Sequence, residues 1–271
     1  MKKILLISDL DGTLLNQTHQ ISPENENAIR RFKEMGGLFT LATGRMEAAV
    51  EPFIQKLGID VPVILYNGAK IVDPVTKKVL YEKQLTIPLS LWSRFMASLT
   101  EADDMALLVY RDGQVYAPVR NAVLEKHEKK DGVVCLPFTD DLIAGPVTKV
   151  MIISDSVQKA NELEQAVLNS GLPCEMVYSE SNYLEILPQH ATKGTALEEL
   201  VRILQIDQPY TIAVGDNLND LAMIRQADLG YAVENAHPQL AAAADAVTVH
   251  HERHAIAAII GDYIEKRREL A

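Results

Sequence analysis

The feature that most constrains the fold is an alternation of short apolar runs with helical segments near both ends of the chain. Lys3–Ser8, Leu38–Ala42 and Val61–Tyr66 are apolar runs separated by helical segments. Continuous apolar runs of this length are typical of strands covered on both faces of a parallel sheet. Because parallel neighbours need crossover connections, the alternation predicts a doubly wound α/β sheet.

The first helical segment has start and stop signals that support this prediction. Ser22 is a suitable N-cap, Pro23 suits the first turn, and acidic residues follow it. Gly36 and Gly37 end the segment after Met35. We therefore predict a helix between the first two strands.

The pattern changes in the middle of the chain and then resumes. From Lys193 onward, helical segments again alternate with apolar runs, at 211–215, 229–233 and 246–249. The intervening chain is predicted to contain hairpins over 70–81 and 105–118, helices over 88–100, 121–130 and 157–170, and strands over 149–154, 175–178 and 183–187. We predict an α/β fold: a Rossmann-like core formed by residues 1–82 and 189–271, with an inserted α+β domain at 83–188.

Charge and composition restrict the partners of the chain. It has 271 residues and a net charge of −11, which disfavours nucleic acid and anionic membranes as partners. An anionic substrate therefore needs a local positive site. Cys135 and Cys174 are far apart, as expected of reduced thiols. The N-terminal apolar run is too short for a signal peptide, since Ser8 and Asp9 break it, so we predict a cytoplasmic protein; its oligomeric state stays open.

Four polar segments follow predicted strands or open predicted helices. They are "DLDGTLL" (9–15), "LATGR" (41–45), "ATKGTAL" (191–197) and "VGDNLNDLAMI" (214–224). Ligands of open α/β sheets bind at the carboxyl ends of the strands. The four segments are therefore predicted to meet at one site.

The residue types in these segments suit phosphoryl transfer. Asp9 is a candidate nucleophile, because a carboxylate can form an aspartyl-phosphate and divide one difficult step into two. A carboxylate and a phosphate dianion repel each other, so a cation must lie between them, and Mg²⁺ prefers such oxygen ligands. Asp9 and Asp216 are its predicted ligands, and Lys193 supplies a positive charge to the transition state.

Together the four segments resemble the signature motifs of the haloacid dehalogenase superfamily of phosphohydrolases. Their order and spacing resemble the Cof-like subgroup, whose large type IIB cap lies between the second and third motifs, and "YNGA" (66–69) and "YLEILPQHATKG" (183–194) extend the resemblance. It covers essentially the whole chain. It implies Mg²⁺-dependent hydrolysis of small phosphorylated metabolites, with sugar phosphates as the leading class, through an aspartyl-phosphate.

The resemblance also assigns roles to Asp11. The residue at that position binds the metal through its backbone carbonyl, which leaves its carboxyl to act as general acid and then base. Asp220 is open between two readings: a group that orients Lys193 or a metal-bound water, and a helix N-terminal residue favoured by the dipole.

Other residues are expected to bind the phosphate. Thr43 and the Gly44 N–H lie at a strand-to-helix turn, where they can donate hydrogen bonds to it. The resemblance adds the Leu10 backbone N–H and the Asn219 side chain, beside Lys193. For Arg45, a contact with the phosphate and a position on the helix surface are equally expected.

Two alternative functions remain. A phosphosugar mutase or other phosphotransferase of the same superfamily would need inserted-domain arginines, such as Arg111 and Arg120, to hold a second phosphate. A non-catalytic phosphate-sensing protein would keep the fold without turnover. Zinc binding by "HHERH" (250–254) is disfavoured, since no cysteine or carboxylate nearby completes a ligand set.

Overall fold

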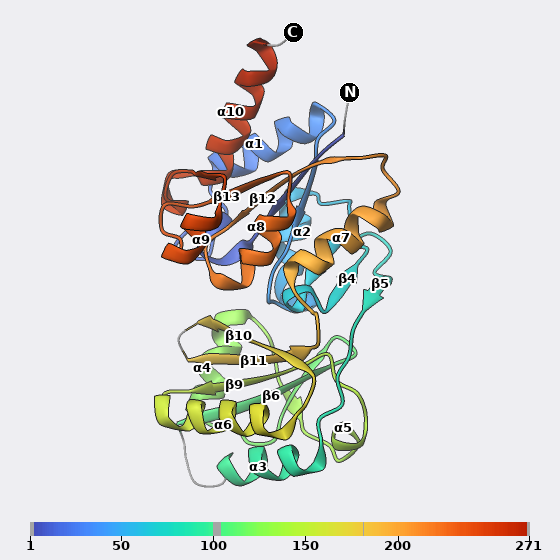
Figure 1. Ribbon diagram of the computed structural model, residues 1–271, viewed down its shortest axis with the longest axis vertical. Helices are drawn as coiled ribbons and strands as arrows, with labels where there is room; N and C mark the ends of the chain where they lie inside the picture. Colours follow the sequence, from blue (N-terminus) through green and yellow to red (C-terminus); the bar gives the residue numbers. More distant parts are fainter. Residues whose placement is uncertain (1–2, 100–103, 181, 270–271) are drawn as a thin grey trace. The chain divides into compact units, whose positions relative to one another are not determined.

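The structure is a computed structural model that describes residues 3–99, 104–180 and 182–269. These residues form two compact units (Figure 1). The described chain of the first unit is 3–43, 51–81 and 192–269, and the rest belongs to the second unit. Helix α2 (Glu47–Leu57) begins in the second unit and ends in the first.

The first unit is built on a five-stranded sheet in which every described pair of neighbours is parallel. The strand order is β14-β13-β12-β1-β2, so the N-terminal strand lies between partners from opposite ends of the chain. This sheet confirms the predicted doubly wound α/β fold. The strands are β1 (Ile4–Ser8), β2 (Leu38–Leu41), β12 (Tyr210–Gly215), β13 (Leu229–Ala232) and β14 (Ala246–Val247).

Helices cover this sheet and bury its apolar side chains. Leu5 and Ile7 point to the same side of β1 and pack in one cluster with Leu197 of α7 and Met223 of α8. Figure 1 shows α1 and α10 side by side at the top of the view, and they pack against each other. The helices are α1 (Pro23–Glu34), α7 (Lys193–Leu204), α8 (Leu221–Gln226), α9 (Pro238–Ala243) and α10 (Ala255–Glu269).

The strand after α2 differs from the sequence prediction. β3 (Val63–Leu65) was expected in the parallel sheet, yet it pairs antiparallel with β4 (Lys70–Val72) in a three-stranded sheet completed by β5 (Val79–Glu82). A single parallel bridge, from Ile64 to Ala42, joins β3 to the end of β2. The physical reason is the tight turn after β3, which reverses the chain and brings β4 back along it.

The second unit is an α+β structure. Its six-stranded sheet has the order β10-β11-β9-β6-β7-β8, with antiparallel pairing except between β7 and β8. β8 was not predicted, because two residues give no periodic signal. The strands are β6 (Met105–Arg111), β7 (Gln114–Ala117), β8 (Leu136–Pro137), β9 (Lys149–Ser154), β10 (Cys174–Glu180) and β11 (Tyr183–Pro188).

Two helices of this unit close one face of its sheet. Trp92 and Phe95 of α3 pack edge to face, 6.1 Å apart, in an apolar cluster that Leu163 of α6 joins. The helices are α3 (Leu89–Leu99), α4 (Ala122–Asp131), α5 (Asp141–Ala144) and α6 (Val157–Ser170), and the predicted end of the first at Thr100 lies outside the described residues.

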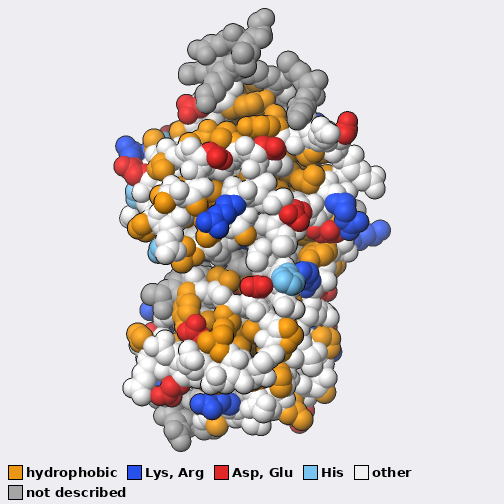
Figure 2. All heavy atoms as spheres, in the orientation of Figure 1, with side chains coloured by type: hydrophobic (Ala, Val, Ile, Leu, Met, Phe, Trp, Pro, Cys, Tyr) orange, Lys and Arg blue, Asp and Glu red, His pale blue; other side chains and the backbone are white. Residues whose placement is uncertain are grey.

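Charged side chains are dispersed on the face drawn in Figure 2. Lys and Arg side chains lie among Asp and Glu side chains there and form no continuous basic stripe. Among the helices in the described part of the chain, none has the length and apolarity needed to cross a membrane.

Candidate active site

A buried ammonium group lies at the centre of the candidate site. Lys193 Nζ is 2.5 Å from Asp9 Oδ1 and 2.6 Å from Asp220 Oδ1. The side chains of Lys193 and Asp220 are fully buried, and Asp9 is only 6% exposed. Charged groups are buried at a large cost unless they are paired, so this arrangement specifies the position of all three side chains.

The local sequence explains how Lys193 is held. Thr192 is the N-cap of α7, and its side chain forms a capping box with Thr195. A lysine at a helix N-terminus opposes the helix dipole, which the two carboxylates of Asp9 and Asp220 offset. Gly194 permits the start of α7 to approach α8, since a Cβ there would lie 2.6 Å from the Ala222 carbonyl oxygen.

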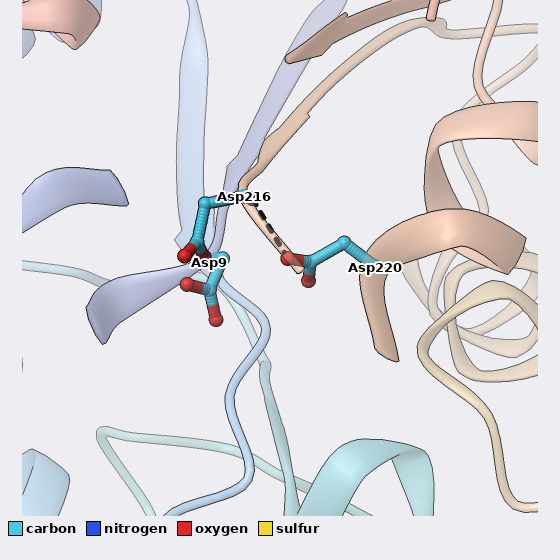
Figure 3. A group of neighbouring side chains, drawn as sticks. All are labelled: Asp9, Asp216 and Asp220. Atoms are coloured by element: carbon cyan, nitrogen blue, oxygen red, sulfur yellow. Dashed lines mark hydrogen bonds between the residues drawn. The ribbon is translucent and has the colours of Figure 1, made fainter. Parts of the chain in front are cut away.

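Three carboxylates meet beside this ammonium group. Asp9 follows β1, Asp216 follows β12, and Asp220 lies just beyond it, with one oxygen of each within 4.8 Å of the others (Figure 3). Asp220 Oδ2 accepts hydrogen bonds from the backbone N–H groups of Asp216, at 3.0 Å, and Asn217, at 3.2 Å. One carboxylate of the three therefore fixes both Lys193 and the loop that carries Asp216.

Two glycines make this close packing possible. Gly12 has a φ of +76°, and a Cβ there would lie 2.4 Å from Asp216 Oδ2. Gly215 ends β12, where a Cβ would lie 2.4 Å from Asp220 Cγ. Both motifs therefore need glycine beside their aspartates for a steric reason.

The pKa values of the site residues are shifted by burial and by the excess of carboxylates over ammonium groups. Burial raises the pKa of Asp9 well above its ordinary value, against the lowering effect of Lys193. Burial, with repulsion from Asp220, raises the pKa of Asp216 to about 7. Burial alone would lower the pKa of Lys193, but Asp220 and Asp9 raise it above its ordinary value, so its ammonium form persists.

The donor set fits a hard divalent cation. The three clustered side chains offer only carboxylate oxygens, which Mg²⁺ prefers, and a single ammonium group leaves their negative charge in excess. A divalent cation beside Asp9 and Asp216 would balance that excess. Among the described residues this is the one cluster of three or more His, Cys, Asp or Glu side chains with metal-binding geometry.

Three residues predicted to contact phosphate, Thr43, Leu10 and Gly44, lie at the ends of β1 and β2 or just beyond them. Thr43 is buried after β2, where its N–H donates to the Ile64 carbonyl and its carbonyl accepts from the Asn67 N–H. Leu10 is buried directly after Asp9. Gly44 belongs to the second unit, in which its carbonyl accepts a hydrogen bond from Lys149 Nζ at 2.9 Å.

Asn219 is held by a residue that sequence reasoning did not select. Its Nδ2 donates to Asn67 Oδ1 at 3.0 Å. Asn67 belongs to the "YNGA" segment, to which the sequence analysis gave no role. A usable signal was present, because Asn-Gly directly after a buried strand predicts left-handed backbone at that point.

Asp11 lies apart from the carboxylate cluster. Its side chain is 42% exposed, and its Oδ1 is 3.6 Å from His19 Nδ1. Asp11 has extended backbone angles, whereas Gly12 is left-handed, so the chain turns sharply after Asp11. Its carboxyl is thus separate from the groups that surround Lys193 and remains open to solvent.

Two further side chains support the site and were not predicted. Thr13 Oγ1 donates to Asp216 Oδ1 at 3.2 Å, and Asn235 Nδ2 donates to the Gly12 carbonyl at 2.8 Å. Thr13 lies in the selected segment 9–15 but was given no role there, and Asn235 lies outside the four selected segments. Their roles follow only from the fold.

The histidine cluster near the C-terminus makes protein contacts. His251 Nδ1 lies 2.7 Å from the Leu15 carbonyl oxygen, and His254 Nδ1 lies 3.0 Å from Ser22 Oγ. His250 accepts a hydrogen bond from the N–H of Glu252. His251 and His254 therefore connect the segment before α10 to the N-terminal part of the first unit.

Comparisons with known proteins identify the family of the chain. A family model described as haloacid dehalogenase-like hydrolase matches residues 6–260. Phosphatase YwpJ of Bacillus subtilis is 30% identical, over 93% of this chain and 97% of YwpJ. Pyridoxal phosphate phosphatase YbhA of Escherichia coli is 28% identical, over 88% of this chain and 90% of YbhA. The HAD subclass IIB sugar phosphatase BT4131 superposes with a TM-score of 0.80 at 24% identity, over 96% of this chain and 99% of BT4131. The chain therefore belongs to the haloacid dehalogenase-like hydrolases, in their Cof-like subgroup, and is a phosphatase.

Proposed function

We propose that the chain is a Mg²⁺-dependent phosphohydrolase that cleaves small phosphorylated metabolites through an aspartyl-phosphate on Asp9. The observation that carries this proposal is the buried ammonium of Lys193 between Asp9 and Asp220, beside Asp216. A buried cation next to a carboxylate nucleophile suits an anionic substrate on a chain whose net charge is −11.

The chemistry divides into two steps. In the first, an Asp9 carboxylate oxygen attacks phosphorus, the bond from phosphorus to the ester oxygen breaks, and Asp11 donates a proton to the leaving oxygen. In the second, water attacks phosphorus and gives a proton to Asp11, and the bond between phosphorus and Asp9 breaks to release inorganic phosphate. The solvent access of Asp11 supports its part in both proton transfers.

The remaining residues bind and orient the phosphoryl group. Thr43, the N–H groups of Leu10 and Gly44, and Asn219 would donate hydrogen bonds to it. Asp9 and Asp216 would hold Mg²⁺ with the backbone carbonyl of Asp11. When bound, the ion supplies positive charge that offsets the repulsion between the Asp9 carboxylate and the phosphate.

We further propose that residues 83–188 act as a cap that selects the leaving group. Lids of this kind exclude water and set specificity in other enzymes. Sugar phosphates are the leading substrate class, and phosphorylated cofactors follow. The names of two similar proteins, a sugar phosphatase and a pyridoxal phosphate phosphatase, support this range.

The mutase alternative is less well supported. Arg120 is bonded to both carboxylate oxygens of Glu128, and Arg111 contacts the Asp141 carbonyl and carboxylate. A second phosphate would have to displace these partners. With a hexose 1-phosphate, isomerisation to the 6-phosphate without phosphate release would nevertheless establish the mutase.

A panel of phosphate esters tests the proposed function. We expect release of inorganic phosphate from sugar phosphates with Mg²⁺, and its loss, to below about one hundredth, after chelation by EDTA. Restored activity on adding Mg²⁺ back controls for unfolding. Absence of turnover with every ester in the panel and with an aryl phosphate would favour the phosphate-sensing alternative.

The proton-transfer role of Asp11 gives a separate prediction. Asp11→Asn removes the titrating proton but keeps the backbone carbonyl, so kcat should fall about 10²–10⁴-fold. The Mg²⁺ concentration at half-maximal activity should change less than about threefold. Steady-state kinetics measure both. A variant with wild-type kcat would remove Asp11 from the mechanism, and His19→Gln, which changes only its neighbour, serves as the control.

A further inference from the structure

A strained turn touches three of the segments that the proposed function assigns to phosphate binding. Tyr66, Asn67 and Gly68 have φ values of +51°, +53° and +101°, three left-handed residues in succession. Tyr66 and Asn67 are buried. Non-glycine residues seldom adopt this conformation, and such strain persists only where surrounding contacts enforce it.

The contacts of the turn identify what it holds. The N–H of Asn67 donates to the Thr43 carbonyl at 2.9 Å, and Asn67 Oδ1 accepts from Asn219 Nδ2 at 3.0 Å. Gly68 packs so closely on the residue before Lys193 that a Cβ would lie 2.2 Å from the Thr192 carbonyl oxygen. All of these contacts lie within the first unit.

The bond to Asn67 determines which end of the Asn219 amide faces it. An amide nitrogen carries two hydrogens, and one of those on Asn219 points to Asn67 Oδ1. If the amide were rotated by half a turn, its oxygen would face the Asn67 oxygen, and two acceptors would repel each other. As long as Asn67 presents its oxygen, the second N–H of Asn219 keeps one direction.

The Asn219 side chain is otherwise unused by the protein. Its Oδ1 is buried and has no hydrogen-bond partner among the described residues, and its Nδ2 makes no second bond there. A buried polar group without a protein partner usually meets a water or a ligand. The second N–H of this amide is thus available to donate to a ligand.

We propose that Asn67 is a positioning residue, which orients the Asn219 amide so that an N–H and not the carbonyl oxygen meets the phosphoryl group. The proposal rests on the proposed function, in which Asn219 binds phosphate. If the Asn219 amide were turned the other way, its carbonyl oxygen would face the phosphate anion and repel it. The hydrogen bond from Asn219 to Asn67 should therefore affect the binding of every phosphate ester, whatever its leaving group.

The test combines Asn67→Gly with Asn219→Ala. Glycine accepts the left-handed backbone of residue 67 and keeps its N–H for Thr43, so it removes the side chain alone. The readout is the inhibition constant of inorganic phosphate against an aryl phosphate, together with kcat/KM. Gln205→Gly is the matched control, because Gln205 is an exposed left-handed residue at the far end of α7.

Asn219→Ala should raise the phosphate inhibition constant about tenfold or more, and Asn67→Gly about three- to tenfold. The double variant should match Asn219→Ala within about twofold, because Asn67 acts through Asn219. Gln205→Gly should resemble the wild type.

Two results would overturn the inference and leave the proposed function intact. They are wild-type phosphate inhibition in Asn67→Gly, and losses that multiply in the double variant. An Asn219→Ala variant with unchanged inhibition would overturn the phosphate contact of Asn219 and the inference with it. A wild-type protein without phosphatase turnover would instead contradict the proposed function.

Discussion

Asp9→Asn is expected to lower kcat by at least about 10³-fold while leaving the protein folded. The amide has nearly the same shape as the carboxylate but cannot act as the attacking nucleophile, and loss of a nucleophile is among the costliest changes to an enzyme. Steady-state hydrolysis of an aryl phosphate measures the loss. The melting temperature should not fall, since three carboxylates share one ammonium group and the substitution removes one of the excess negative charges.

The control for Asp9→Asn is Asp207→Asn, which makes the same chemical change at an exposed position of the first unit. It should keep wild-type kcat and melting temperature. Turnover by Asp9→Asn at a rate near that of the wild type would rule out a covalent intermediate on this residue.

Lys193→Met is expected to have the largest effect on stability. Methionine fills much of the volume of lysine but leaves Asp9 and Asp220 buried without their counter-ion. Removing one partner of a buried ion pair costs roughly 3–5 kcal/mol. For a chain of this size that corresponds to a fall in melting temperature of about 6–20 °C. Thermal unfolding followed by circular dichroism measures it, and phosphatase activity should be lost.

Two variants sharpen the Lys193 prediction. Adding Asp220→Asn to Lys193→Met removes one uncompensated charge, so part of the stability should return while activity stays absent. Lys159→Met breaks the more exposed ion pair with Asp104 and should cost less than about 1 kcal/mol. A Lys193→Met protein that melts with the wild type would mean that Lys193 is not paired in a buried site.

The sequence predicted the elements of the first unit well where periodicity and end signals agree. The capped helices at Pro23 and Lys193 and the apolar strands β1 and β12 are present near their predicted bounds. β3 was assigned to the wrong sheet, because its apolar run is equally consistent with parallel or antiparallel pairing. The left-handed turn after β3 reverses the chain and so makes the pairing with β4 antiparallel. The direction of pairing therefore depends on the tertiary structure and not on the apolar run itself.

The charged residues of the candidate site could be predicted from the sequence, but the hydrogen bonds that join its side chains could not. Asp9, Lys193 and Asp216 were selected because their types and order suit phosphoryl transfer, and the fold brings them together. For Asp220 two readings were open, and the structure bonds it directly to Lys193. The link from Asn67 to Asn219 spans distant parts of the chain. Spacing along the sequence carries no information on such a contact.

The position of β1 in its sheet has a consequence for biosynthesis. β1 is complete at residue 8, but the strand that closes its other edge begins at residue 210. At a synthesis rate of about 5–20 residues per second, that partner leaves the ribosome roughly 10–40 s later. The second unit, whose chain is nearly continuous from residue 82 to 191, is complete well before then. The nascent chain therefore finishes the second unit first, and it must keep an apolar strand with an open edge from aggregating until the last quarter of the protein emerges.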